Sequence, residues 1–334
     1  MDYQEYRIPA QRVRSLVWHE HALIDWAAGG HRYQLDGTCK QSSVGYAYRF
    51  DAALQSASGA WVVIYERLGT KGVLLHHGKI VREINRSFYY ADAYEYPVAF
   101  LQHPDGRELL GHCPRYRHML EIEDLATGEC LTNAVQREPS DFFHSRLTIS
   151  PKQTWFLSAG WVWHPIDSLG LYQLDQALAD PQILDYRNVD LASDVEINTA
   201  SFIDDQTLLL VTGELLDWEG QIEDSPFYNL GKQCLARYNL TTNHIDSIVK
   251  AEEKVGLIMP LDQQYVLGFY DHPKLFDCTT GKVIQRWPEL TTGKQISSIM
   301  HHLEAVPPPM AFDPINRRFA VADATGITVI ELKY

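Results

Sequence analysis

Residues 97–132, PVAFLQHPDGRELLGHCPRYRHMLEIEDLATGECLT, contain the pattern of short strands that decides the fold. An apolar run, VAFLQ, stops at a Pro-Asp-Gly turn and is followed by a second short run, RELLG. A polar loop, HCPRYR, leads into the alternating segment HMLEIEDL, and a Thr-Gly turn then opens a fourth strand. Such short runs between Gly, Pro, Asp and Asn have the length of strands and lack a helical period. The stretch therefore predicts one antiparallel unit of four strands.

The same order of parts recurs along the chain, which makes a repeat architecture the first hypothesis. The inner strands of the seven units are expected near residues 16, 46, 98, 146, 200, 257 and 310. Their average spacing of about 49 residues is close to the length of a propeller blade. We expect YAYRFD (46–51) as the inner strand of the second unit and LYQLDQAL (171–178) as part of the sheet of the fourth.

The turn after the third strand shows the clearest sequence similarity between units. Residues 124–128 (DLATG), 239–243 (NLTTN) and 277–281 (DCTTG) each begin with Asp or Asn and end with Gly or Asn. Asp and Asn side chains can hydrogen-bond to backbone two residues on, and Gly or Asn tolerates positive φ. These segments predict one hairpin turn used three times.

The repeats resemble those of the WD40-like and YVTN-type bacterial β-propellers over nearly the whole chain, although the Trp-Asp and Gly-His signatures of WD40 repeats are absent. The resemblance implies an architecture and no activity: an all-β, seven-bladed β-propeller in one domain, residues 1–334. We expect the blades near residues 12–37, 45–86, 97–133, 144–184, 198–250, 256–288 and 308–334, the last completed by residues 2–9.

The last unit has only three strands before the chain ends at Tyr334. Residues 2–9 alternate polar and apolar positions, as an extended segment would. Because an unclosed ring would leave two strand edges open to aggregation, we predict that this segment pairs with 327–334 and closes the ring.

The composition limits the classes of partner. A net charge of −14 and a pI near 5.4 argue against nucleic acid and anionic membranes, which require a basic surface. No apolar run long enough to cross a bilayer and no secretory signal is recognisable. The five cysteines are far apart and odd in number, so we expect reduced thiols and a cytoplasmic location.

Propeller geometry sorts the connections onto two rims, because strands alternate in direction within a blade. One rim carries short, generic turns, whereas the other carries long loops rich in aromatic and histidine residues. Chemically rich loops on a rigid scaffold usually carry function, and Trp, Tyr and Arg often anchor interfaces. The candidate partner-binding residues are Arg115, Tyr116, Phe143, His144, Trp161, Trp163, His164, Glu214, Asp217, Trp218, Glu219, Tyr270 and His272. The alternative for the loop tryptophans is that they fold inward and join blades.

Two further segments stand out on this rim. Residues 213–231 form the longest insertion, which is acidic and contains interleaved aromatic residues. We expect either a loop that docks on a basic partner or a solvated loop without a ligand. The connection before the third blade holds Phe88, Tyr89, Tyr90, Tyr94 and Tyr96, which we expect to pack beneath the loop rather than line a surface.

Two functions from different classes follow. The first is a non-catalytic cytoplasmic protein without a cofactor that holds a partner protein, as a toxin-neutralising immunity-type protein or as a scaffold. The acidic net charge favours a basic partner. The second is a propeller enzyme of the lactonase, lyase or hydrolase kind, with a small molecule and a divalent metal at the channel mouth. The residues considered for that metal are Asp141, His144, His164, His272 and His301. No H-E-x-x-H, G-x-S-x-G, G-x-G-x-x-G or Walker pattern supports the second function.

Overall fold

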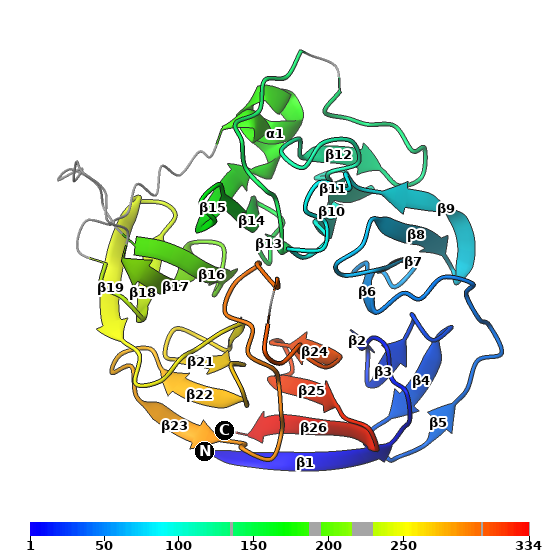
Figure 1. Cartoon of the computed structure of the whole chain (residues 1–334), viewed down its shortest axis with the longest axis vertical. Helices are drawn as coiled ribbons and strands as arrows, with labels where there is room; N and C mark the ends of the chain where they lie inside the picture. The colour runs from blue at the N-terminus through cyan, green and yellow to red at the C-terminus, as the bar shows by residue number, and fades with distance from the viewer. Residues whose placement is uncertain (134–135, 187–194, 216–229, 302, 334) are drawn as a thin grey trace.

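The computed structural model describes residues 1–133, 136–186, 195–215, 230–301 and 303–333. These residues form seven antiparallel sheets arranged as blades around a central axis (Figure 1). The predicted seven-bladed β-propeller is therefore confirmed. Counting from β2, the first strand of each blade in chain order lies nearest the axis, and the later strands lie further out. Strand β1 is the exception, because it forms the outer edge of the last blade.

The strands follow the chain from blade to blade. The first blade contains β2 (Val17–His19), β3 (Ala22–Asp25), β4 (His31–Gln34) and β5 (Cys39–Lys40). The second contains β6 (Ala52–Gln55), β7 (Trp61–Tyr65), β8 (Lys71–His76) and β9 (Lys79–Asn85). The third contains β10 (Val98–Gln102), β11 (Glu108–His112) and β12 (Glu121–Asp124). The fourth contains β13 (Leu147–Ile149), β14 (Trp155–Val162) and β15 (Ile166–Gln173).

The remaining three blades each have four strands. The fifth contains β16 (Val195–Phe202), β17 (Thr207–Leu215), β18 (Cys234–Asn239) and β19 (His244–Lys250). The sixth contains β20 (Ile258–Pro260), β21 (Tyr265–Gly268), β22 (Lys274–Asp277) and β23 (Val283–Arg286). The seventh contains β24 (Met310–Asp313), β25 (Arg318–Ala322) and β26 (Gly326–Lys333), with β1 (Asp2–Pro9) as its outer strand.

The outer strand is replaced in the third and fourth blades. In the third, an isolated bridge between Glu123 and Cys130 marks its position. In the fourth, we expected LYQLDQAL to be strand throughout, but β15 ends at Gln173 and the prediction is wrong beyond it. The helix α1 (Leu174–Ala179) and the short 3-10 helix η1 (Pro181–Asp185) follow instead. Leu174, Ala177 and Leu184 are buried against the third blade, so helical spacing fills the gap between these two blades.

The inner strand of the second blade also begins later than expected. Residues 46–51 are not part of the sheet, and β6 starts at Ala52. Phe50 is buried and Tyr46 is partly buried against Ala27 and Val62, between the first and second blades. The alternation in YAYRFD therefore reflects packing of a connecting segment rather than strand pairing.

Apolar contacts between neighbouring blades form the core. Seven hydrophobic clusters in the described part of the chain each join two consecutive blades. In the cluster between the seventh and first blades, for example, Ile8, Val329 and Ala320 meet Leu23 and Tyr33. Each sheet buries both faces in this way, and its stability depends on both neighbours.

The three echoing turns have the predicted geometry. The side-chain oxygen of Asp124 accepts hydrogen bonds from the backbone N–H groups of Ala126 (2.9 Å) and Thr127 (3.0 Å), and Gly128 has φ +73°. The turns that begin at Asn239 and Asp277 repeat these side-chain contacts. The shared Asp or Asn therefore has a mechanical role, since it fixes the hairpin.

The predicted closure of the ring is confirmed. Strand β1 pairs antiparallel with β26 along its whole length, from Asp2 opposite Lys333 to Pro9 opposite Gly326. Arg7 reinforces this pairing with an ion pair to Asp323 at 2.7 Å, and Ile8 is fully buried. The two ends of the chain thus form one blade (Figure 1).

Replacement of Ile8 by Ala tests the contribution of this closure. We expect the Ile8→Ala variant to lose about 2–5 kcal/mol of unfolding free energy, because a buried branched side chain leaves a cavity. Urea unfolding measures the loss. The matched control, Glu5→Ala, alters an exposed side chain of the same strand and should stay within about 0.5 kcal/mol of the parent protein. Equal stability of both variants would contradict the closure.

Candidate functional site: an aromatic face and an adjoining polar cavity

The connection between β23 and β24, described for residues 287–301 and 303–309, crosses the centre of the ring (Figure 1). The backbone of Gly293 pairs with Asp271, and that of Ile299 pairs with Tyr94. The N–H group of Met300 also donates to the carbonyl of Ala93 at 2.7 Å. This crossover therefore ties the sixth blade to the connection between the second and third blades, on the rim of long loops.

A buried aromatic cluster lies where this crossover meets the third and fourth blades. The rings of Phe143 and Trp161 stack with centroids 3.7 Å apart, and Tyr94 meets Phe143 edge-on at 5.5 Å. Their backbones are joined as well, since the N–H group of Phe143 donates to the carbonyl of Trp161 at 2.8 Å. Trp163 and Ile299 are partly buried against this cluster. The cluster is a rigid base for whatever lies above it.

We call five aromatic side chains near that base the aromatic face: Phe88, Tyr89, Tyr90, Tyr116 and the partly buried Trp163. Tyr89 and Tyr90 contact Trp163, Phe88 precedes Tyr89 in the chain, and Tyr116 precedes Arg117, which lies over the ring of Tyr89. Phe88 is 85% exposed and Tyr116 57% exposed, large values for such side chains. Tyr90 meets Trp163 edge-on at 5.0 Å, and Tyr89 meets Tyr90 at 4.9 Å. The face thus combines fixed rings with solvent-accessible ones.

The side chain of Arg117 links the aromatic face to the buried cluster beneath it. The guanidinium of Arg117 lies over the ring of Tyr89 at 4.5 Å and over the ring of Phe143 at 4.6 Å. It also forms an ion pair with Asp141 at 2.7 Å. Because one side chain contacts an exposed and a buried ring, Arg117 couples the two layers.

Three predicted partner-binding residues are buried, so in this structure they pack inside the protein and do not line its surface. Phe143, His144 and Trp161 are at most 2% exposed. Strand β14 continues to Val162, which makes Trp161 a strand residue that packs inward rather than a loop residue. Burial lowers the pKa of His144 to about 3, and its Nδ1 lies 3.1 Å from Ser158 Oγ, so the ring is neutral. Phe143 and Trp161 contact Trp163 of the aromatic face, whereas His144 packs against Phe142.

The other predicted residues are spread around the rim. Arg115, His164 and Glu214 are exposed, and Glu214 forms an ion pair with Lys232. Tyr270 and His272 are partly buried at the sixth blade. Of the predicted set, the structure brings Trp163 and Tyr116 to the aromatic face. Asp217, Trp218 and Glu219 lie outside the described residues.

The five residues considered for a metal site do not converge. His144 is buried, Asp141 is held by Arg117, and His272 Nδ1 is 3.2 Å from Asp271. His164 and His301 are exposed elsewhere on the rim. Within the described ranges, no three His, Cys, Asp or Glu side chains are grouped so that they could hold an ion. In that part of the chain these five residues are not grouped as one site, and a metal held by them stays a prediction from the sequence.

Sequence reasoning missed Phe88, Tyr89 and Tyr90 as candidates. The aromatic density of residues 88–96 was the available signal, and we expected it to pack inward. Tyr94 and Tyr96 do so, at 1% and 3% exposure. Arg86 binds this connection from within, through hydrogen bonds to the carbonyls of Gly69, Ala91, Tyr94 and Glu95. The first three rings of the segment are thereby left facing out.

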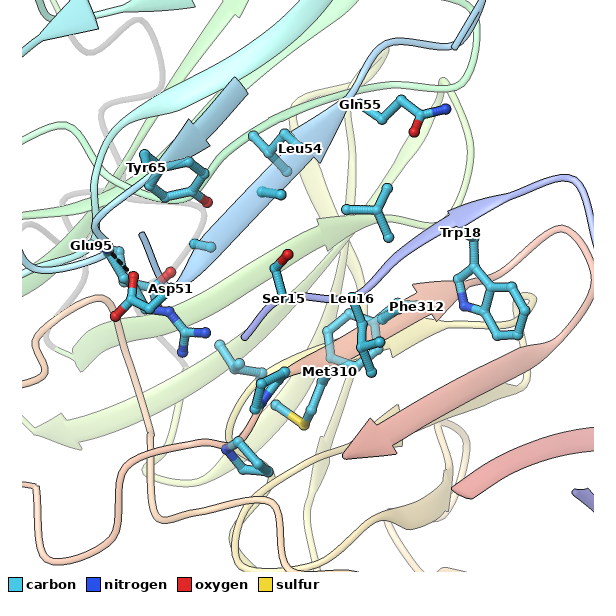
Figure 2. A pocket seen from close by; sticks show the side chains of 18 of the residues that line it. Ser15, Leu16, Trp18, Asp51, Leu54, Gln55, Tyr65, Glu95, Met310 and Phe312 are labelled. Atoms are coloured by element: carbon cyan, nitrogen blue, oxygen red, sulfur yellow. Dashed lines mark hydrogen bonds between the residues drawn. The ribbon is translucent and has the colours of Figure 1, made fainter. Parts of the chain in front are cut away.

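A pocket of about 390 Å³ occupies the channel beside the first, second and seventh blades (Figure 2). Its walls are mainly apolar, from Leu16, Leu54 and Phe312 among others. Asp51 and Glu95 lie at one end and Trp18 at the other (Figure 2). Asp51 accepts a hydrogen bond from the N–H group of Arg67 at 2.7 Å, and Glu95 accepts one from Gln295. Protein donors therefore already contact both carboxylates.

A second, larger cavity of about 570 Å³ lies between the fourth, fifth and sixth blades and the crossover. Its polar lining includes Asp167, Glu196 and Ser297. Ile299 lines this cavity and also contacts the buried aromatic cluster, and Asp167 is the cross-strand neighbour of Trp161. The cavity therefore adjoins the aromatic face without sharing its exposed rings.

Comparison with known protein families and with curated proteins finds no match to this chain. The site is therefore interpreted from its own geometry. In the part of the chain that the structure covers, no helix has the length and apolarity needed to cross a membrane.

Two substitutions distinguish the base from the face. We expect Trp161→Ala to lower the unfolding free energy by about 3–5 kcal/mol, because a fully packed indole is removed. Tyr116→Ala should change it by less than about 0.5 kcal/mol, because that ring is exposed. Chemical denaturation followed by circular dichroism measures both. A Trp161 variant as stable as the parent protein would contradict the two-layer arrangement.

Proposed function

We propose that this propeller is a binding protein that holds a partner protein on its aromatic face. The proposal rests on the arrangement of the aromatic side chains in two layers. Phe88, Tyr90 and Tyr116 are exposed, and Tyr94, Phe143 and Trp161 form a packed cluster. Trp, Tyr and Arg side chains contribute most of the binding energy at protein interfaces. Exposed aromatic side chains gathered on one part of a folded domain are a signature of an interaction site.

Rigidity supports the proposal independently of composition. Trp163 is fixed by edge-on contacts with Phe143 and Trp161, each at 5.4 Å, and Arg117 fixes Tyr89. Side chains that are already ordered lose less conformational entropy when a partner binds. Arg115, beside Tyr116, adds a guanidinium that suits carboxylate or carbonyl groups at the edge of the contact.

Charge favours a basic partner. The net charge of −14 accelerates the encounter with a positively charged protein at low ionic strength. Neutralisation of a toxin or enzyme with a basic active site is the form of this function that we favour, with a scaffold role second. A cytoplasmic location is part of the proposal, and the five free thiols are consistent with it.

The enzyme considered from the sequence has less support. Its proposed metal ligands are dispersed, and His144 is buried and neutral. Binding through the aromatic face requires no such convergence, and the required side chains are already in place.

Site-specific crosslinking combined with a triple substitution tests the function. A photoreactive residue at Tyr116 should capture one partner in the native cell, and the same residue at Ile315, which is 91% exposed on the opposite rim, should not capture it. With the purified partner, Phe88→Ala, Tyr90→Ala and Tyr116→Ala combined should weaken Kd by more than about tenfold, which corresponds to about 1.4 kcal/mol.

The matched control removes exposed apolar side chains elsewhere. Ile80→Ala combined with Ile315→Ala alters side chains that are 63% and 91% exposed, away from the aromatic face. We expect this control to bind as the parent protein does. Undiminished binding by the triple variant, with its fold intact by circular dichroism, would refute the proposal.

A further inference from the structure

We propose that the cavity between the fourth, fifth and sixth blades binds a small organic amine, whose ammonium group is held by the carboxyl groups of Asp167 and Glu196. This site is separate from the aromatic face, because none of the five side chains of that face lines it. Its volume of about 570 Å³ lies within the range of small-molecule sites.

Asp167 is the central observation. It lies on β15 opposite Trp161, lines the cavity and is only 8% exposed. Its Oδ1 atom is buried and has no hydrogen-bond partner within the described structure. A buried carboxyl oxygen without a donor costs free energy that a ligand N–H group would recover. Asp167 therefore lines the cavity and has one buried acceptor atom without a donor.

Glu196 supplies the second carboxyl group. Its Oε1 accepts a hydrogen bond from the N–H group of Asp167 at 3.4 Å, so the two acids are neighbours across β15 and β16. Burial raises the pKa of both, that of Asp167 to about 7. An ammonium group carries three donors, which suits two adjacent carboxyl groups, whereas Ca²⁺ or Mg²⁺ requires more oxygen ligands.

The charges around this pair still favour a cation. The guanidinium of Arg146 is close enough to Asp167 to interact with it electrostatically. Arg146 donates hydrogen bonds to Thr199 Oγ1 at 3.1 Å and to the carbonyl of Asn198, and Glu95 also interacts electrostatically with it. Asp167 and Glu196 line the cavity, whereas Arg146 does not.

Lysines surround the entrance and are mostly occupied. Lys232 pairs with Glu214 and Lys294 with Glu304, while Lys254 lies over the ring of Tyr270 at 5.2 Å. The side chains of Lys232 and Lys294 are 53% and 39% exposed, whereas Asp167 is 8% exposed, so these two lysines lie further out than Asp167 and are paired with carboxylates. The polarity of the site, negative inside and positive at the entrance, orients an amine with its charged end inward.

Titration calorimetry with butylamine as the probe tests the site. Butylamine should bind the full-length protein, and its uncharged analogue 1-butanol should not. Asp167→Asn keeps the size of the side chain and should lower the butylamine affinity by at least about tenfold. Asp141→Asn, which alters an exposed carboxylate paired with Arg117 on the same rim, is the matched control and should leave it unchanged.

The pH dependence gives a second readout. The ionised carboxylate binds the cation, so affinity should rise between pH 6 and pH 8 by up to about tenfold as Asp167 loses its proton. The groups that face Asp167 are Arg146, Glu196 and Ser297. If Asp167→Asn fails to fold, Glu196→Gln replaces it in the same titration.

Failure of the site and failure of the proposed function are distinguishable. The triple variant of the aromatic face should lose the partner and retain butylamine, whereas Asp167→Asn should retain the partner. If Asp167→Asn no longer captures the partner, the cavity binds a basic side chain of that partner. This result would overturn the proposal that it binds a free amine. Butylamine binding that is absent, unaffected by both carboxyl variants, or matched by 1-butanol would also overturn the inference.

Discussion

Apolar contact between consecutive blades is the constraint on which the rest of this structure depends. A sheet of three or four short strands cannot bury both of its faces alone, and each blade here does so against the blades before and after it. The ring must therefore close, or two blades lose half of their contacts. Strand β1 closes it by pairing with β26, which places Ile8 between the seventh and first blades. Residues more than three hundred positions apart thus share one cluster.

A closed ring allows the two rims to differ. On one rim, Asp or Asn side chains satisfy the backbone of tight turns, and little else is required of those segments. On the other, the connections are long enough to contact one another, and the crossover of residues 287–309 reaches the connection before the third blade. That contact orders Tyr94, Phe143 and Trp161 as a base. Tyr89 and Trp163 are held in place because they contact this packed layer.

The interior also holds polar groups at a cost that the apolar clusters offset. His112 is buried beside Glu123, which pairs with Arg82, and burial lowers the pKa of His112 to about 3. Arg86 satisfies the carbonyls of a whole connection, so its role is structural. Asp167 differs from these groups, because it lines a cavity and its buried Oδ1 atom has no hydrogen-bond partner in the described protein.

The sequence by itself determined the repeat, the seven blades, the echoing turns and the closure by residues 2–9, because strand length, alternation and turn residues are local properties that recur with a fixed period. It could not determine which side of a loop faces solvent. Trp161 and Phe143 looked like exposed anchors, and Phe88 and Tyr90 looked like packing, yet their positions are reversed. The helix that begins at Leu174 and the placement of Asp167 beside Glu196 were likewise decided only by the tertiary structure. Burial depends on what neighbouring blades and the crossover bring to a residue, and those contacts span intervals that no local pattern records.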